Sequence, residues 1–129
     1  MTFEDGLKAF LTGSPYPLAV QGRVYSHAAP QNPGQPYIVI YRISPTPMIT
    51  HRGGTPVITY LYQFSIFGTS QAAVLGIADS LRRLLHGFSG TMGSYTVPSV
   101  IWSGERSGFN DTTRMHQIAA DYRIQYLDE

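Results

Sequence analysis

The segment VITYLYQFSIFG, residues 57–68, is the longest candidate strand in the chain. Its β-branched and aromatic residues favour an extended backbone. Successive side chains of a strand point to opposite faces, and one face of this segment is apolar or aromatic throughout. That face carries Ile58, Tyr60, Tyr62, Phe64 and Ile66. The other face includes the polar residues Thr59, Gln63 and Ser65. We therefore predict a strand over Val57–Phe67 whose first face packs on the core.

The residues that follow this strand predict a helix, TSQAAVLGIADSLRRLLHG. Thr69 or Ser70 would cap its N-terminus. Apolar residues recur at helical spacing. They are Val74, Ile77, Ala78, Leu81, Leu84 and Leu85. Gly87 suits the position just beyond a helix end.

The residues that precede the strand predict a hairpin and a further strand. The tip is HRGG, in which Gly53 and Gly54 can adopt the positive φ that tight hairpins need. The arm Ser44–Pro56 contains two early prolines, so we expect it to be exposed or to lie at a sheet edge. Before it, Tyr37–Ser44 is nearly continuous in apolar residues, which indicates a strand covered on both faces.

The two ends of the chain complete the pattern. The first ten residues predict a helix that Thr2 caps, with an apolar stripe of Phe3, Leu7, Phe10 and Leu11. Arg23–Ser26 predicts a short strand. After the second helix we expect one strand that contains an edge-like Pro98. A last strand is expected over Thr113–Leu127, and the inner face of its alternation carries His116, Ile118, Ala120, Tyr122, Ile124 and Tyr126. The order of helix, strands, helix and strands indicates an α+β fold in one domain, residues 1–129. It consists of one mostly antiparallel sheet, two helices packed on it and a protruding β-hairpin.

Composition restricts the possible functions. Charged residues make up 13% of the 129, against about 25% in an average protein, and the net charge is +1. No basic patch typical of nucleic-acid binders is evident. The chain has no cysteine and no apolar run as long as a membrane span. A thinly charged surface is poorly protected against association, which favours an oligomer.

The glycine-rich stretch after the second helix could be read as a chemical loop. It contains Gly87, Gly90 and Gly93, with Ser89 between the first two. A nucleophile elbow needs G-x-S-x-G on a strand-to-helix turn, but Thr91 replaces the last glycine here. A dinucleotide fingerprint also precedes a helix, whereas this stretch follows one. We expect Gly87 to end the helix and a short hairpin to turn around Gly93.

The remaining polar residues do not form a recognisable site. His27, His51, His86 and His116 lie far apart, and no pair has metal-ligand spacing. We expect His116 to be a core or interface residue, and Asp121 to pair with Arg123 or Arg106. The tyrosines on the predicted inner faces could stack on bases, but core packing is the stronger interpretation. We therefore expect no catalytic residues, no metal and no cofactor.

Several segments, taken in order, resemble one family. They are GRVYSHAAPQNPGQPYIVIYRIS, LRRLLHGFSGTMG, WSGER and HQIAADYRIQY. Together they resemble the tail completion proteins of long-tailed bacteriophages, of the head-to-tail joining or tail terminator type. The resemblance covers nearly the whole chain, although no single motif is diagnostic.

This resemblance implies a structural virion protein that is not an enzyme. Similar proteins form a ring, commonly a hexamer, that caps the tail tube and joins it to the head connector. The expected partners are other copies of the chain, the tail tube protein and the head connector or completion protein. DNA would only pass through the lumen, and no membrane is involved. The expected location is the head–tail interface of the virion, after assembly in the host cytoplasm.

Two surfaces are candidates for subunit or tail-tube contacts. The first is the arm, where Met48 and Ile49 lie outside any obvious core and His51 and Arg52 approach the tip. The second is an expected loop over Ser107–Thr113. Its candidate contact residues are Arg106 and Asp111.

Two other classes remain open at this point. One is another small phage assembly protein, either a head-closure protein or a minor tail component. The other is a small enzyme or ligand-binding domain whose site is assembled from distant residues. Binding to tail tube protein would separate the first alternative from the tail completion hypothesis, and the oligomeric state would separate the second.

Overall fold

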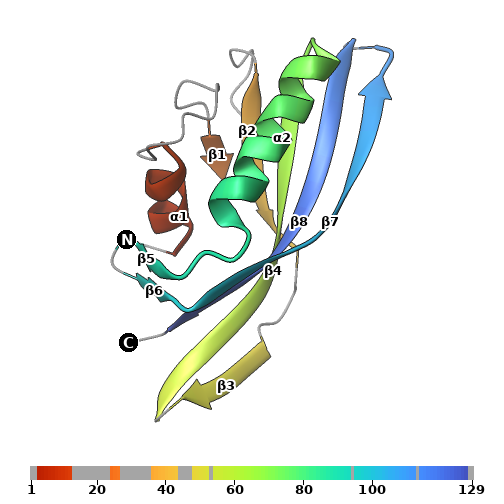
Figure 1. Ribbon diagram of the computed structural model, residues 1–129. Coiled ribbons are helices and arrows are strands. Elements are labelled where there is room, and N and C mark those ends of the chain that lie inside the picture. The colour runs from red at the N-terminus through yellow and green to blue at the C-terminus, as the bar shows by residue number, and fades with distance from the viewer. Residues whose placement is uncertain are drawn as a thin grey trace.

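The computed structural model describes residues 3–12, 24–26, 36–43, 48–52, 54–93, 95–112 and 114–127. Two helices and eight strands form in these ranges (Figure 1). They are α1 (Phe3–Thr12), β1 (Val24–Ser26), β2 (Tyr37–Arg42), β3 (Met48–Arg52), β4 (Thr55–Gly68), α2 (Gln71–Leu85), β5 (Gly90–Met92), β6 (Tyr95–Val97), β7 (Ser99–Asn110) and β8 (Met115–Leu127).

One large sheet organises the molecule. Its strand order is β1-β2-β4-β8-β7, and β3 also pairs with β4. Among the described strand pairs, only the short pair of β1 and β2 is parallel. The central pair, β4 and β8, runs in continuous register from Val57 opposite Leu127 to Gly68 opposite His116. The expected α+β fold with a mostly antiparallel sheet is therefore confirmed.

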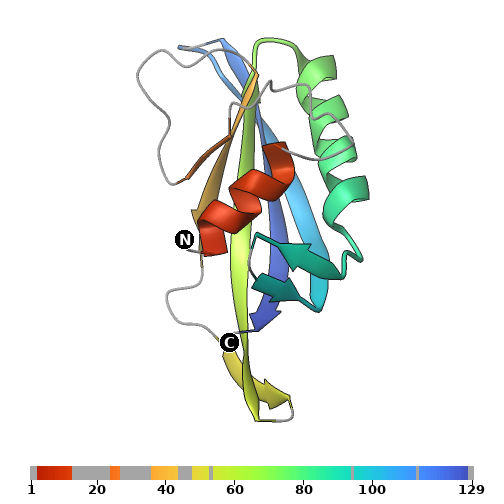
Figure 2. The same ribbon diagram turned by 90° about the vertical axis from the view of Figure 1, so that its left-hand side faces the viewer.

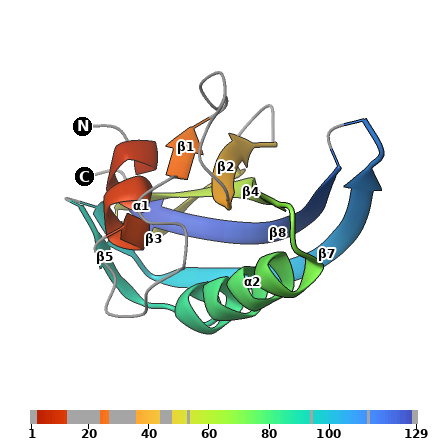
Figure 3. The ribbon, with the colours of Figure 1, turned by 90° about the horizontal axis from the view of Figure 1, so that it is seen from above.

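Both helices lie on one face of this sheet. Figure 2 shows α1 and α2 side by side over the strands. Helix α1 contacts β1 and β5, whereas α2 contacts β4, β8 and β7. Seen from above, the far end of the β7–β8 hairpin curves away from α2 (Figure 3). The sheet therefore extends beyond the area that the helices cover.

The core lies between the helices and the apolar face predicted from the alternation. On β4 and β8 this face is fully buried at Tyr62, Phe64, Ile66, Tyr122 and Ile124. The predicted helix stripes are also buried. Their buried members are Phe3, Leu7 and Leu11 in α1, and Val74, Ile77, Ala78, Leu81 and Leu85 in α2. The Phe3 ring stacks on Tyr126 with centroids 4.2 Å apart, so aromatic contacts fix α1 on the sheet.

Most element ends agree with the sequence predictions. Ser70 caps α2, and its side-chain oxygen accepts a hydrogen bond from the Ala73 N–H. Gly87 follows the helix with φ of 79°, a conformation that favours glycine. Strands β5 and β6 form the short hairpin expected around Gly93. The predicted cap Thr2, the Pro45 and Pro47 positions and Gly53 lie outside the described residues.

The single strand expected around Pro98 is not observed. Instead, Pro98 separates two strands, β6 and β7. Because proline has no N–H to donate, the chain leaves one ladder there and joins another. β6 pairs with β5, and β7 pairs with β8 in the large sheet.

Candidate functional site

The protruding arm is the hairpin of β3 with the first residues of β4. Arg52 lies opposite Thr55, and Met48 lies opposite Thr59. The last residue of β8, Leu127, lies opposite Val57 of β4. The first two residues of β4, Thr55 and Pro56, therefore pair with β3 alone. Figure 1 shows this hairpin extending beyond the helices and the remaining strands. The arm predicted from the HRGG tip is therefore present as a hairpin outside the core.

The candidate contact residues of the arm all lie on β3. Met48, Ile49, His51 and Arg52 lie in register opposite Thr59, Ile58, Pro56 and Thr55 of β4. Ile49 is 55% exposed, more than any other large hydrophobic residue in the described ranges. It lies opposite Ile58, on the face of the sheet that carries the helices. No described residue of the arm buries Ile49, and its role in a contact stays a prediction.

The second candidate surface differs from the expected loop. Strand β7 continues through Ser107 to Asn110, paired with β8, so the loop expected over Ser107–Thr113 is wrong. The turn is shorter, because the strand opposite supplies backbone partners as far as Met115. Asp111 lies exposed in this turn, where the Asn110 side chain accepts a hydrogen bond from the Thr112 N–H at 2.9 Å.

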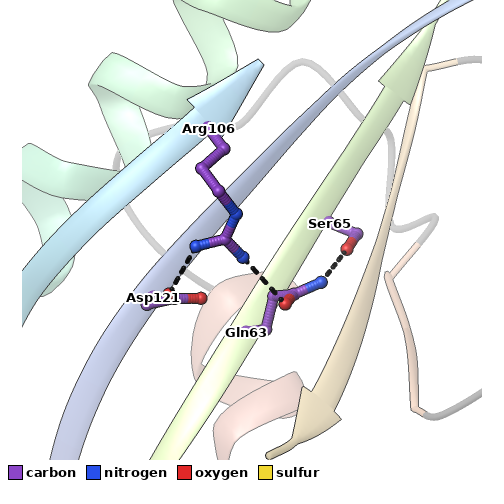
Figure 4. Close-up of polar contacts among 4 residues, drawn as sticks. All are labelled: Gln63, Ser65, Arg106 and Asp121. Atoms are coloured by element: carbon purple, nitrogen blue, oxygen red, sulfur yellow. Dashed lines mark hydrogen bonds and ion pairs between the residues drawn. The ribbon is translucent and has the colours of Figure 1, made fainter. Parts of the chain in front are cut away.

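Arg106 lies on the face of the sheet opposite the helices. Its Nη1 donates to Asp121 Oδ2 at 3.1 Å, and its Nη2 donates to Gln63 Oε1 at 3.4 Å (Figure 4). Gln63 Nε2 in turn donates to the Ser65 hydroxyl at 2.9 Å. The sequence left Arg106 and Arg123 open as partners of Asp121, and the structure selects Arg106. The guanidinium therefore connects β7, β8 and β4.

The two candidate surfaces do not meet within one chain. The arm adjoins the C-terminal end of β8, whereas Asp111 precedes its N-terminal end. Arg106 also lies across two strands from β3 in the sheet order. If both surfaces make contacts, they contact different neighbours or different parts of one neighbour.

The stretch that resembled a chemical loop instead joins α2 to β7. The His86 Nδ1 accepts a hydrogen bond from the Trp102 N–H at 3.1 Å. The Gly87 N–H donates to the Val100 carbonyl at 2.8 Å. Sequence spacing could not reveal this link, because its partners are separated by the β5–β6 hairpin. His86 thus has a structural partner on the edge of the sheet.

A groove between α2 and the far end of β7 has no signal in the sequence. Its volume is about 270 Å³, and its lining includes Val74, Leu75, Ser107, Phe109 and His116. Phe109 and His116 pack across the two strands with ring centroids 4.7 Å apart. Within the described ranges, no group of His, Asp and Glu residues could hold a metal ion. Neither of the helices seen there is long and apolar enough to cross a membrane.

Comparison with known proteins supplies a structural relative. No protein-family model matches the chain, and no curated protein matches its sequence. Sixteen chains of solved structures match it in fold. One belongs to a structure described as the virion of a native gene transfer agent particle. It aligns with a TM-score of 0.72 and 12% identity, over 93% of this chain and 91% of that one. At this identity the likeness shows a shared fold.

Proposed function

We propose that this protein is a structural component of a phage-like particle, in which it forms a ring at the end of the tail tube. The observation that carries this proposal is the fold, shared over almost the full length of both chains with a chain of a gene transfer agent virion. The tail completion resemblance of the sequence points to the same kind of particle. In this proposal, residues 1–129 act as one tail-completion-like domain.

The arm supports self-association. A two-stranded hairpin is only marginally stable by itself in water, and this one extends past the core with Ile49 exposed. Packing against a neighbouring subunit would bury that side chain and support the hairpin. The candidate contacts Met48, Ile49, His51 and Arg52 belong to this interface in our proposal.

The proposed partners follow from the position in the particle. Copies of the chain form the ring, which we take to be a hexamer, and its two sides meet the tail tube protein and the head connector. DNA crosses the lumen without being held, which agrees with a net charge of only +1. This function requires no catalytic residue and no cofactor.

Light scattering after size exclusion tests the proposal, at low and at high protein concentration. We expect a discrete species whose mass is a small multiple of the 14.3 kDa chain, and rings in negative-stain images. Incubation with tail tubes should place these rings at tube ends. A monomer at every concentration that also fails to bind tube ends would contradict the proposal. Binding to the connector without binding to tubes would instead indicate a head-closure protein.

A further inference from the structure

Strand β7 is the last strand of the large sheet, and only its first part is covered along the outer edge. There the Trp102 N–H donates to His86 and the Val100 carbonyl accepts from Gly87. The backbone groups of Val100 and Trp102 therefore point away from β8. Along a strand of an antiparallel pair, residues whose backbone N–H and C=O groups point toward the partner strand alternate with residues whose backbone groups point away from it.

The same alternation identifies the outward-pointing residues of the second part of β7. A β-bulge between Trp102 and Gly104 shifts the register by one residue, so Gly104 lies opposite Asp121. From there the backbone groups that point away from β8 are those of Glu105, Ser107 and Phe109. No strand in the described part of the chain pairs with this edge. An edge of this kind is a template for another strand.

The groove beside this edge would receive side chains from an added strand. Its wall on α2 includes Leu75, which is 46% exposed, and its wall on β7 includes Phe109, which is 45% exposed. The side chains of Ser107 and Phe109 lie on the helix face, opposite Ile118 and His116. An apolar side chain on the helix face of an added strand would therefore pack between Leu75 and Phe109.

Strand β3 has a matching edge, with which no strand in the described ranges pairs. The Ile43 N–H donates to the Leu61 carbonyl at 2.8 Å. The backbone N–H and C=O groups of Leu61, and of every second residue before it in β4, therefore point toward β2 and β3. The residues paired with Thr59, Val57 and Thr55 are Met48, Thr50 and Arg52, so the backbone groups of these three point toward β4. The backbone groups of Ile49 and His51 consequently point away from β4, at the free edge. The exposed Ile49 side chain lies on the helix face.

The free edges of β3 and β7 match in two ways: their outward-pointing residues carry side chains on the helix face, and their strand directions allow antiparallel pairing. β7 runs parallel to β4, since both are antiparallel to β8, whereas β3 runs antiparallel to β4. The free edges of β3 and β7 also lie on opposite sides of the sheet. A second copy in the same orientation can therefore place its β3 antiparallel to β7, with the helix faces of both sheets on one side.

We propose that β3 of a second copy adds to the Glu105–Phe109 edge of β7 and inserts Ile49 into the groove between α2 and β7. This inference rests on the proposed ring, and it defines the contact between adjacent subunits. Because the two surfaces differ, the contact is head-to-tail, and such contacts generate rings when the rotation closes. Figure 1 shows β3 and the free end of β7 at opposite ends of the sheet, so adjacent copies are displaced along the strands.

Engineered cysteines test the proposed pairing directly. The chain has no cysteine, so Ile49→Cys with Phe109→Cys introduces only two thiols. A second pair, Ile49→Cys with Ser107→Cys, covers the alternative register. Opposite residues of paired strands lie at a Cα separation that a disulfide can span. We expect one of the double variants to form covalent oligomers on oxidation, whereas the single variants do not.

A proline substitution provides a second, independent test. The Ser107 N–H points outward in this assignment, so Ser107→Pro removes a donor from the edge and none from the ladder with β8. We expect self-association to weaken about tenfold, the effect of one lost backbone hydrogen bond. Ser107→Ala retains the N–H and serves as the matched control. Circular dichroism and thermal melting verify that both variants keep the fold.

The outcomes separate this inference from the proposed function. Rings that form without a cross-link in either double variant would overturn the pairing and leave the ring function standing. A dimer cross-linked by Phe109→Cys alone would also overturn it, because two β7 edges would then meet. If the protein forms neither oligomers nor cross-links and does not bind tube ends, both proposals are wrong.

Discussion

Arg106 and Asp121 form an ion pair across β7 and β8, with Arg106 Nη1 and Asp121 Oδ2 3.1 Å apart. The Arg106 side chain is 64% exposed, whereas that of Asp121 is only 17% exposed. The other carboxylate oxygen, Asp121 Oδ1, is buried with no hydrogen-bond partner among the described residues. Arg106 therefore supplies the charge that compensates a carboxylate largely removed from water.

Replacing this arginine should leave the largely buried Asp121 carboxylate without a compensating charge, although the guanidinium itself is well solvated. For Arg106→Ala we expect a loss of about 1–3 kcal/mol in the free energy of unfolding, and a smaller loss at high salt. Urea denaturation at two salt concentrations measures both. Arg123→Ala is the matched control, since Arg123 is exposed on β8 and forms no ion pair within the described ranges. Equal losses in the two variants would contradict the assigned role of Arg106.

Two helical glycines should respond to alanine with opposite signs. A Cβ on Gly6 in α1 would lie 2.8 Å from the Met92 carbonyl oxygen, a backbone atom of β5. The helix or the hairpin must then shift, so we expect Gly6→Ala to destabilise by about 1–3 kcal/mol. Gly76 is exposed in α2 with no atom within 4 Å of such a Cβ. Gly76→Ala should stabilise by about 0.5–1 kcal/mol, because alanine is the better helix former. Thermal melts of both variants test this, and a shift of the same sign in each would contradict it.

The buried tyrosine on β8 should make stability depend on alkaline pH. Burial, with a smaller contribution from the nearby Glu105, raises the pKa of Tyr122 well above its ordinary value of 10.0. The unfolded chain therefore loses this proton at a lower pH than the folded chain. The stabilisation is fully present below about pH 10 and is lost as the pH rises toward the folded pKa, by up to about 1.4 kcal/mol per pH unit.

The variant Tyr122→Phe isolates this effect. In this variant the free energy of unfolding should decrease less steeply above pH 10 than in the wild type. A smaller decrease should remain, because burial also raises the pKa of Tyr37. At neutral pH the variant should be at least as stable as the wild type. The reason is that the Tyr122 hydroxyl is buried with no hydrogen-bond partner in the described ranges. Denaturant midpoints between pH 8 and about 11 give the comparison. Parallel curves for the two proteins would rule out Tyr122 as the titrating group.

Deletion of the arm should separate folding from assembly. Removing Pro47–Pro56 takes away β3 and the part of β4 that pairs only with β3, and it leaves every residue paired between β4 and β8. We expect a folded monomer that forms no ring. Circular dichroism verifies the fold and light scattering the mass. An intact ring would show that the arm is not the contact.

The sequence alone determined those features that depend on local periodicity. The alternation in Val57–Phe67 and in the last strand identified the buried faces, which carry Tyr62 and Tyr122. Helical spacing located the stripe on α2, and the glycines identified the hairpin tip and the end of the helix. These patterns are reliable because a side chain's face follows directly from its position along its own element.

Only the tertiary structure decided the features that depend on which segments meet. The sequence predicted a loop over Ser107–Thr113, yet β8 supplies a ladder that keeps this segment extended as far as Asn110. The choice of Arg106 over Arg123 as the partner of Asp121 depends on the same register. The groove beside Phe109 exists because α2 is fixed to the other half of β7 through His86 and Gly87. Strand pairing joins residues far apart in the chain, so no local pattern contains this information.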